Sequence, residues 1–249
     1  MPNEKRVTTG LVLRQTPTKE SDWILTVLTP DLGRVGVIAK GARGRKSKVS
    51  AACQLLTYSE LTLTARGEWY YLDEASTVEL FGGLRQDITL LALGSYFAEL
   101  CEAICTAEAA PELLRLMLNA LYALSVLRKN PAVVKPAFTF RLMALAGFAP
   151  YCDDCAVCGK TPEKPVLDTV QGVVHCAACK TGGLSLPLTA GALDALRYIL
   201  RCEDKRLYSF FAAANDLKLL DHAAEAFTAA QLERSFRTLD YYKQVKSEE

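Results

Sequence analysis

Two pairs of cysteines constrain the fold of this chain more than any other feature, because one shared metal ion would join two separate segments. Cys155 and Cys158 form a first CxxC pair, and Cys176 and Cys179 form a second pair after seventeen intervening residues. This spacing is typical of a zinc ribbon, since two residues between thiolates allow one tight turn to aim both sulfurs at a single ion. Four protein ligands leave no open position, so the sequence predicts a structural Zn²⁺ site at these four cysteines.

Two neighbouring side chains are rival ligands. Cys152 lies three residues before Cys155 and makes a further CxxC, and His175 directly precedes Cys176. A redox-active CxxC is the alternative to a metal site, but no βαβ pattern surrounds these cysteines.

The composition is that of a globular protein with ample core, because 50% of the 249 residues are hydrophobic and 23% are charged. No stretch approaches the roughly 20 apolar residues that a membrane helix needs. The N-terminus, MPNEKRVTTG, has no apolar segment of the kind found in secretory signals. Nine cysteines without such a signal favour metal ligands over disulfides. We therefore expect a cytoplasmic protein.

The first third of the chain alternates apolar and polar residues in short runs, the pattern of β-strands. The predicted strands cover residues 7–13, 23–28, 34–39, 55–65 and 69–80. Pro17 and the polar residues after it are expected in the first turn, and residues 66–68 in the last. Five short strands with a long insertion after the third suit a small closed barrel, and the five-stranded OB-fold commonly binds nucleic acid.

Four aromatic residues of these strands have two interpretations. Trp23, Trp69, Tyr70 and Tyr71 either stack on bases or fill the barrel and its rim. Because successive side chains alternate faces in a strand, at least one of the last three must point outward.

The long insertion is strongly basic. Residues 40–48 read KGARGRKSK, and five of the nine are cationic while none is acidic. The whole chain has 29 Lys+Arg and 28 Asp+Glu, so the remainder has 24 cations against 28 anions and the positive charge is local. Phosphate is the commonest partner of such a glycine-containing loop, and the alternative is a solvated loop without a partner. The predicted DNA contacts are Arg34, Lys40, Arg43, Arg45, Lys46 and Lys48.

The pattern becomes helical after about residue 84. Helices are predicted from Asp87 to about 104, at 111–127, 131–146, 189–201 and 205–214, and as one long helix from Asp216. The helix at 131–146 should be central, because it is too apolar for a free surface: it contains Phe138, Phe140, Leu142, Met143 and Leu145. Segments 165–168 and 172–174 can form a short hairpin between the cysteine pairs.

These elements predict an α+β multidomain protein. Residues 1–82 would form the OB-fold domain, residues 83–149 and 187–249 an all-α domain, and residues 150–186 an inserted zinc ribbon-like segment.

The sequence does not favour an enzyme. A zinc-dependent deaminase needs H-x-E with P-C-x-x-C, and neither His175 nor His222 is followed by that pattern. No P-loop, GxSxG or paired-carboxylate motif stands out. A protein scaffold with an inert barrel is a further alternative, against which the basic loop argues.

The order of a β-barrel, helices and an inserted cysteine segment, together with several short sequence motifs, resembles the RecO family of bacterial recombination mediator proteins. The resemblance runs from residue 6 to about 200. The strings are ESD at 20–22, LTP at 28–30 with Gly33, AKG at 39–41, RQD at 85–87, and GFAP at 147–150 leading to Cys155 and Cys158. Two positions depart from the family pattern: Leu55 stands where a proline is usual, and Cys152 where the family usually has no cysteine.

This resemblance implies an OB-fold that binds single- and double-stranded DNA, a helical domain and a structural zinc site, with no bond-making activity. It implies annealing of complementary strands and, with RecR, loading of RecA onto DNA covered by single-strand-binding protein (SSB) in the RecF pathway. Partners would then be DNA, RecR and the C-terminal tail of SSB, with RecA involved indirectly and no membrane. The expected location is the cytoplasm, in association with the nucleoid.

Overall fold

The computed structural model describes residues 4–105, 108–179 and 183–247. It divides into two compact units, which we describe separately. The first comprises Met1–Val126 and Phe236–Glu249, and the second comprises Leu127–Ser235.

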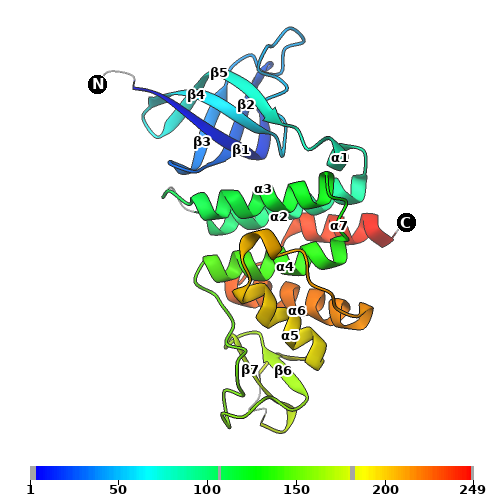
Figure 1. Cartoon of the computed structure of the whole chain (residues 1–249). Helices are drawn as coiled ribbons and strands as arrows, with labels where there is room; N and C mark the ends of the chain where they lie inside the picture. Colours follow the sequence, from blue (N-terminus) through cyan, green and yellow to red (C-terminus); the bar gives the residue numbers. More distant parts are fainter. Residues whose placement is uncertain (1–3, 106–107, 180–182, 248–249) are drawn as a thin grey trace. The chain divides into compact units, whose positions relative to one another are not determined.

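The first unit begins with a closed five-stranded barrel, as predicted (Figure 1). Its strands are β1 (Lys5–Thr18), β2 (Asp22–Thr29), β3 (Gly33–Ala39), β4 (Tyr58–Arg66) and β5 (Trp69–Glu79). The order around the barrel is β1-β2-β3-β5-β4, and only the β3–β5 pair is parallel. Inward-facing Val, Leu and Ala side chains fill the interior.

Strand β1 is long enough to pair with two neighbours in succession. Residues Lys5–Leu11 pair with β4, and Leu11–Thr18 pair with β2. Pro17, predicted in the turn, lies in this second half, where β1 has a single strand neighbour and a missing N–H is tolerated. The turn follows at residues 19–21.

The fourth strand begins later than predicted, at Tyr58 instead of residue 55. Leu56 adopts a left-handed backbone with φ of 58°, which interrupts the extended chain while its side chain is buried. Its N–H donates to the Val12 carbonyl at 2.8 Å, so the turn is anchored to β1.

Four helices complete the first unit: α1 (Gly82–Arg85), α2 (Ile88–Ile104), α3 (Pro111–Ser125) and α7 (Arg237–Ser247). The α2 helix starts where predicted, because the Asp87 side chain accepts a hydrogen bond from the Leu90 N–H. It packs against both α3 and α7 (Figure 1).

The second unit is built on α4 (Pro131–Leu145), α5 (Ala190–Arg201) and α6 (Ala214–Leu232). The α4 helix packs against the other two, and Phe138, Phe140, Leu142 and Met143 are fully buried, as predicted. Leu145, at its end, is 45% exposed. The Lys135 ammonium is also buried, and it forms ion pairs with Asp221 and Glu225 of α6.

A small sheet carries the metal-binding segment. Strands β6 (Pro165–Asp168) and β7 (Val173–Cys176) form the predicted hairpin, and β8 (Ser185–Pro187) pairs with the other side of β6. The third strand was not predicted, because three residues are too few to show an alternating pattern.

Two helix predictions were wrong. The single helix from Asp216 is two helices, because Glu233 takes a left-handed φ of 50° and ends α6; Phe236 then packs edge-to-face on Tyr96 at 6.0 Å. The predicted helix at 205–214 is absent: residues 207–213 are not helical, a short turn covers Asp204–Arg206, and Ala214 already begins α6. There the Tyr198 hydroxyl donates to the Arg206 carbonyl and the Phe210 ring lies 5.7 Å from the Tyr198 ring, so side-chain packing replaces helical bonding.

The two compact units are divided differently from the predicted domains, since helices α1, α2, α3 and α7 belong to the same unit as the barrel. Domain boundaries after residues 82, 149 and 186 stay predictions.

Candidate metal centre and nucleic-acid interface

The four predicted cysteine ligands come together at one end of the small sheet. Their sulfur atoms all lie within 4.8 Å of one another, and the Sγ atoms of Cys158 and Cys176 are 4.0 Å apart. An ion with Zn–S bonds of about 2.3 Å places tetrahedral sulfurs about 3.8 Å apart. The donor set therefore fits a tetrahedral thiolate-bound ion without rearrangement of the backbone.

Backbone geometry explains this convergence. Gly159, at a φ of 68°, closes the first CxxC turn through its N–H to the Cys155 carbonyl at 2.8 Å. The β6–β7 hairpin delivers Cys176, and the turn at Ala177–Cys179 delivers the fourth sulfur. The Cys176 N–H donates to Cys155 Sγ at 3.3 Å. This hydrogen bond directly links the second cysteine pair to the first.

The two rival ligands lie outside the cluster. Among the described residues, the group able to hold a metal ion contains the four cysteines and neither Cys152 nor His175. Cys152 is buried and its carbonyl accepts from Arg197 Nε at 2.8 Å. The His175 ring is buried with Nδ1 3.3 Å from the Cys176 carbonyl oxygen.

The thiols of the cluster differ in acidity. Desolvation raises the pKa of Cys155, but backbone N–H donors from Cys158 and Cys176 outweigh it and lower that pKa to about 6. A side-chain hydrogen bond with Cys158, followed by desolvation, raises the pKa of Cys179 to about 12. One thiolate forms readily at neutral pH and a second forms with difficulty, so four thiolates together require a cation.

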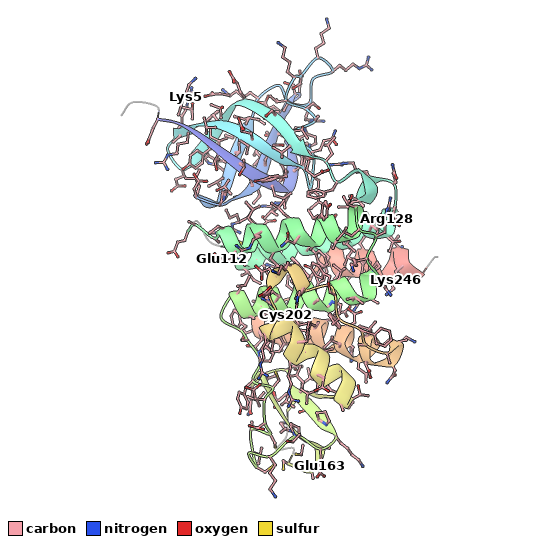
Figure 2. The ribbon with its side chains drawn as sticks, viewed as in Figure 1. Lys5, Glu112, Arg128, Glu163, Cys202 and Lys246 are labelled. Atoms are coloured by element: carbon pink, nitrogen blue, oxygen red, sulfur yellow. The ribbon has the colours of Figure 1, made fainter. Side chains whose placement is uncertain are left out.

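The basic loop lies at one end of the barrel, between β3 and β4. Nitrogen-tipped side chains project outward from it (Figure 2). All five loop cations are exposed: Lys40, Arg43, Arg45, Lys46 and Lys48. No carboxylate lies among residues 40–48, so the loop itself presents five cations and no anion.

The loop is fixed at its base. The Gly41 N–H donates to the Asp22 carboxylate at 2.8 Å, and the Arg43 N–H donates to the Ser21 carbonyl at 2.9 Å. Ala42 is fully buried and Val49 packs against the barrel core. The loop is therefore anchored to the barrel at its base, while its cationic side chains are exposed.

Three of the cations of this region contact aromatic rings. Lys40 Nζ lies 5.1 Å from the Tyr71 ring centre and Arg66 Cζ lies 4.9 Å from it. Arg43 Cζ lies 5.1 Å from the Trp23 ring centre. Arg66 was missed by sequence reasoning, because its proximity to Tyr71 depends on the β4–β5 register, in which Thr64 is paired with Tyr71.

Arg34 is separated from the other predicted DNA contacts. It lies at the opposite end of β3 from Lys40, about 20 Å away at about 3.3 Å per residue. Its Nη1 donates to the Glu102 carbonyl at 2.6 Å, near the C-terminus of α2, where Arg14 also pairs with the Glu102 carboxylate. This contact ties the barrel to the helix, and a DNA contact of Arg34 stays a prediction.

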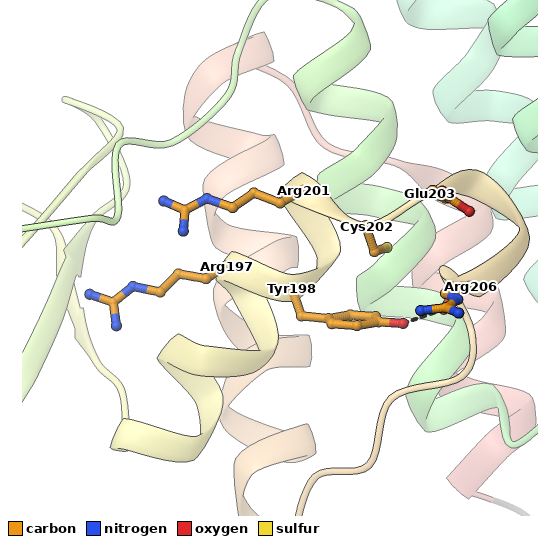
Figure 3. A pocket seen from close by; sticks show the side chains of 6 residues that line it. All are labelled: Arg197, Tyr198, Arg201, Cys202, Glu203 and Arg206. Carbon is orange, nitrogen blue, oxygen red and sulfur yellow. Dashed lines mark hydrogen bonds between the residues drawn. The ribbon is translucent and has the colours of Figure 1, made fainter.

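A hollow of about 470 Å³ lies at the C-terminal end of α5 (Figure 3). Its lining residues are Arg197, Tyr198, Arg201, Cys202, Glu203 and Arg206. Arg197 donates to the carbonyls of Cys152 and Asp153, and Arg201 pairs with the Asp153 side chain, so two arginines of α5 hold the segment that leads to the metal cluster. Further along the chain, between the residues that line the hollow and α6, Phe211 is 95% exposed.

The sequence matches known proteins along most of its length. Residues 4–81 match the family described as Recombination protein O N terminal, and residues 85–240 match Recombination protein O C terminal. The chain belongs to the RecO family.

Among relatives in this family, the DNA repair protein RecO of Acetivibrio thermocellus is 30% identical over 239 residues, which cover 95% of both chains. The DNA repair protein RecO of Caldicellulosiruptor saccharolyticus is 29% identical over 95% of this chain and 97% of its own. The protein of the same name from Anaeromyxobacter sp. strain K is 36% identical over 202 residues, or 79% and 78% of the two chains. The predicted family and barrel fold are thus confirmed.

In the described part of the chain, no helix has the length and apolarity needed to cross a membrane.

We expect the metal to depend on both cysteine pairs. Cys155→Ser or Cys176→Ser should lower bound zinc from about one ion per chain to well below half, because each change removes one of four thiolates. The matched control is Cys152→Ser, which lies outside the cluster and should retain the ion. Metal analysis by mass spectrometry of protein purified without added zinc measures this. Full retention in both ligand variants would contradict the assignment.

Proposed function

We propose that this protein is a recombination mediator in DNA repair. It binds single- and double-stranded DNA, anneals complementary strands and, with RecR, helps load RecA onto SSB-covered DNA in the RecF pathway. Membership of the RecO family supports this role, as does a closed barrel with a cationic loop. It acts in the cytoplasm in association with the nucleoid, and by binding alone, without making or breaking covalent bonds.

The observation that carries the proposal is the concentration of positive charge on an anchored loop. Five exposed cations stand at one end of the barrel in a chain whose remaining residues have an excess of acidic groups. Lysine and arginine gain affinity for DNA by displacing condensed counterions, regardless of base sequence. The same neutralisation reduces repulsion between two strands, which is what annealing requires.

The zinc ion is proposed to be structural. Four cysteines complete the coordination and leave no position for water or substrate, so Lewis-acid chemistry has no open position at this site. Cys155, Cys158, Cys176 and Cys179 would hold the ion and thereby fix the small sheet.

The hollow beside α5 is proposed as the docking site for the C-terminal tail of SSB. Its arginines suit an acidic segment, while the Tyr198 ring suits an apolar residue at the end of such a tail.

DNA binding should be mainly electrostatic. If about five phosphates are neutralised, log K should fall with log salt at a slope of about −3.5 for single strands, an approximately hundredfold loss between about 50 and 200 mM salt. Replacing Arg45, Lys46 and Lys48 by alanine should flatten the slope by about two units and weaken every sequence alike. Fluorescence anisotropy across a salt series measures both quantities.

The control removes the same charge elsewhere. Lys129, Lys218 and Lys246 are exposed lysines outside the barrel, and their replacement by alanine should leave the slope unchanged. Equal slopes in the loop variant and the wild type would show that DNA meets another face of the protein.

The tail proposal has its own test. An acidic peptide with apolar C-terminal residues should bind the full chain, and Arg206→Glu should weaken it by about tenfold through charge repulsion in the hollow. Lys218→Glu, on α6, reverses an exposed charge that does not line the hollow and serves as the control. Calorimetric titration measures both affinities. Equal binding of the peptide by the two variants would contradict the assignment of the hollow as the docking site.

A further inference from the structure

The outward face of β5 carries two aromatic residues in succession. Tyr70 and Leu72 pack against the barrel core. Successive side chains of a strand point to opposite faces, so Trp69 and Tyr71 point outward. This resolves which of the adjacent aromatic residues fill the barrel and which are available to a ligand.

Trp69 packs against the barrel wall at Gly36. A Cβ atom added to Gly36 would come within 2.8 Å of Trp69 Cζ3 and 3.0 Å of Cε3, so the indole covers this glycine closely. The side chain is still 41% exposed. The indole is therefore held against β3 and the side chain remains partly open to a ligand.

Tyr71 is the second platform, and two cations accompany it. Lys40 and Arg66 lie over its ring at 5.1 and 4.9 Å from the centre. One comes from the base of the basic loop and the other from the end of β4. Cations from two other chain segments thus meet at one ring of β5.

An acidic residue marks one limit of this surface. Asp73 is two residues beyond Tyr71, and it accepts from Thr64 Oγ1 at 2.6 Å and pairs with Lys5 at 3.7 Å. Its carboxylate repels phosphate, so the phosphates of a bound strand would lie against Lys40 and Arg66 and not against Asp73.

We propose that Trp69 and Tyr71 are stacking platforms for two unpaired bases, with Lys40 and Arg66 binding the adjacent phosphates. This inference rests on the proposed DNA binding and adds the class of ligand, an unstacked single strand. Residues two apart in a strand are about 6.7 Å apart. Bases in duplex DNA are about 3.4 Å apart and stacked on each other, so an extended, unstacked strand matches this spacing and a duplex does not.

The energetics favour exchange of a cation for a base. A cation over an exposed aromatic ring strengthens that contact by about two- to fivefold in its equilibrium constant. Stacking of a base on an aromatic side chain strengthens DNA binding by about five- to 150-fold. A cation displaced from Tyr71 also gains a phosphate, so a base should replace it.

The other two aromatic residues are less suited to this role. Tyr70 and Trp23 are both partly buried and pack against the barrel core. The platform therefore consists of the two outward residues of β5.

The test compares a short oligothymidine with an abasic strand of the same length, by anisotropy with the full chain. Tyr71→Ala should weaken oligothymidine by about five- to 150-fold, change the abasic strand by less than about twofold, and leave the salt slope unchanged. Tyr71→Leu keeps apolar bulk but has no aromatic face, and it should behave like alanine. Tyr71→Phe should retain wild-type binding. Tyr122→Ala removes an exposed tyrosine of α3 as the control.

The outcomes separate this inference from the proposed function. Equal wild-type binding of the base-bearing and abasic strands would overturn the platform while leaving electrostatic DNA binding intact. Wild-type affinity for oligothymidine in Tyr71→Leu, which avoids a cavity, would overturn it as well. A wild-type protein that bound neither strand at low salt would overturn the proposed function itself.

Discussion

The parallel pairing of β3 with β5 is the contact on which the barrel and its binding surface both depend. It is short, with Val37 opposite Tyr70 and Ile38 opposite Tyr71. Without it the five strands would form an open sheet with two free edges. The same register places Lys40, which follows β3, beside Tyr71, so closure of the barrel also assembles the cation–aromatic surface.

The second unit depends on a different constraint, the convergence of two CxxC turns. Its small sheet has strands of only three or four residues, too little to be stable without support. A metal ion at the four cysteines would supply that support, and Arg197 and Arg201 of α5 bind the segment that precedes them. The metal cluster and the hollow at the end of α5 are thus connected through two arginines.

Features encoded by near neighbours could be predicted from sequence. The cysteine spacing gave the metal cluster, the alternation of apolar residues gave five strands, and the capping residues Asp87 and Thr189 marked true helix starts. Features that depend on distant partners could not. Alternation required one of Trp69, Tyr70 and Tyr71 to face outward, but only pairing with β3 and β4 places Lys40 and Arg66 on Tyr71. Likewise, the bond from Arg34 to the Glu102 carbonyl links residues 68 positions apart, and no local pattern indicates it. The break at Glu233 had no glycine or proline to mark it.

The central claim is that nucleic acid binds at the loop end of the barrel, and photocrosslinking tests it most directly. A single strand carrying a photoreactive thymine analogue would be irradiated with the full chain, and the attachment sites located by peptide mass spectrometry. We predict crosslinks in residues 40–48 and 66–71, lost at high salt because phosphate contacts are screened. Crosslinks confined to residues 127–235 would contradict the account.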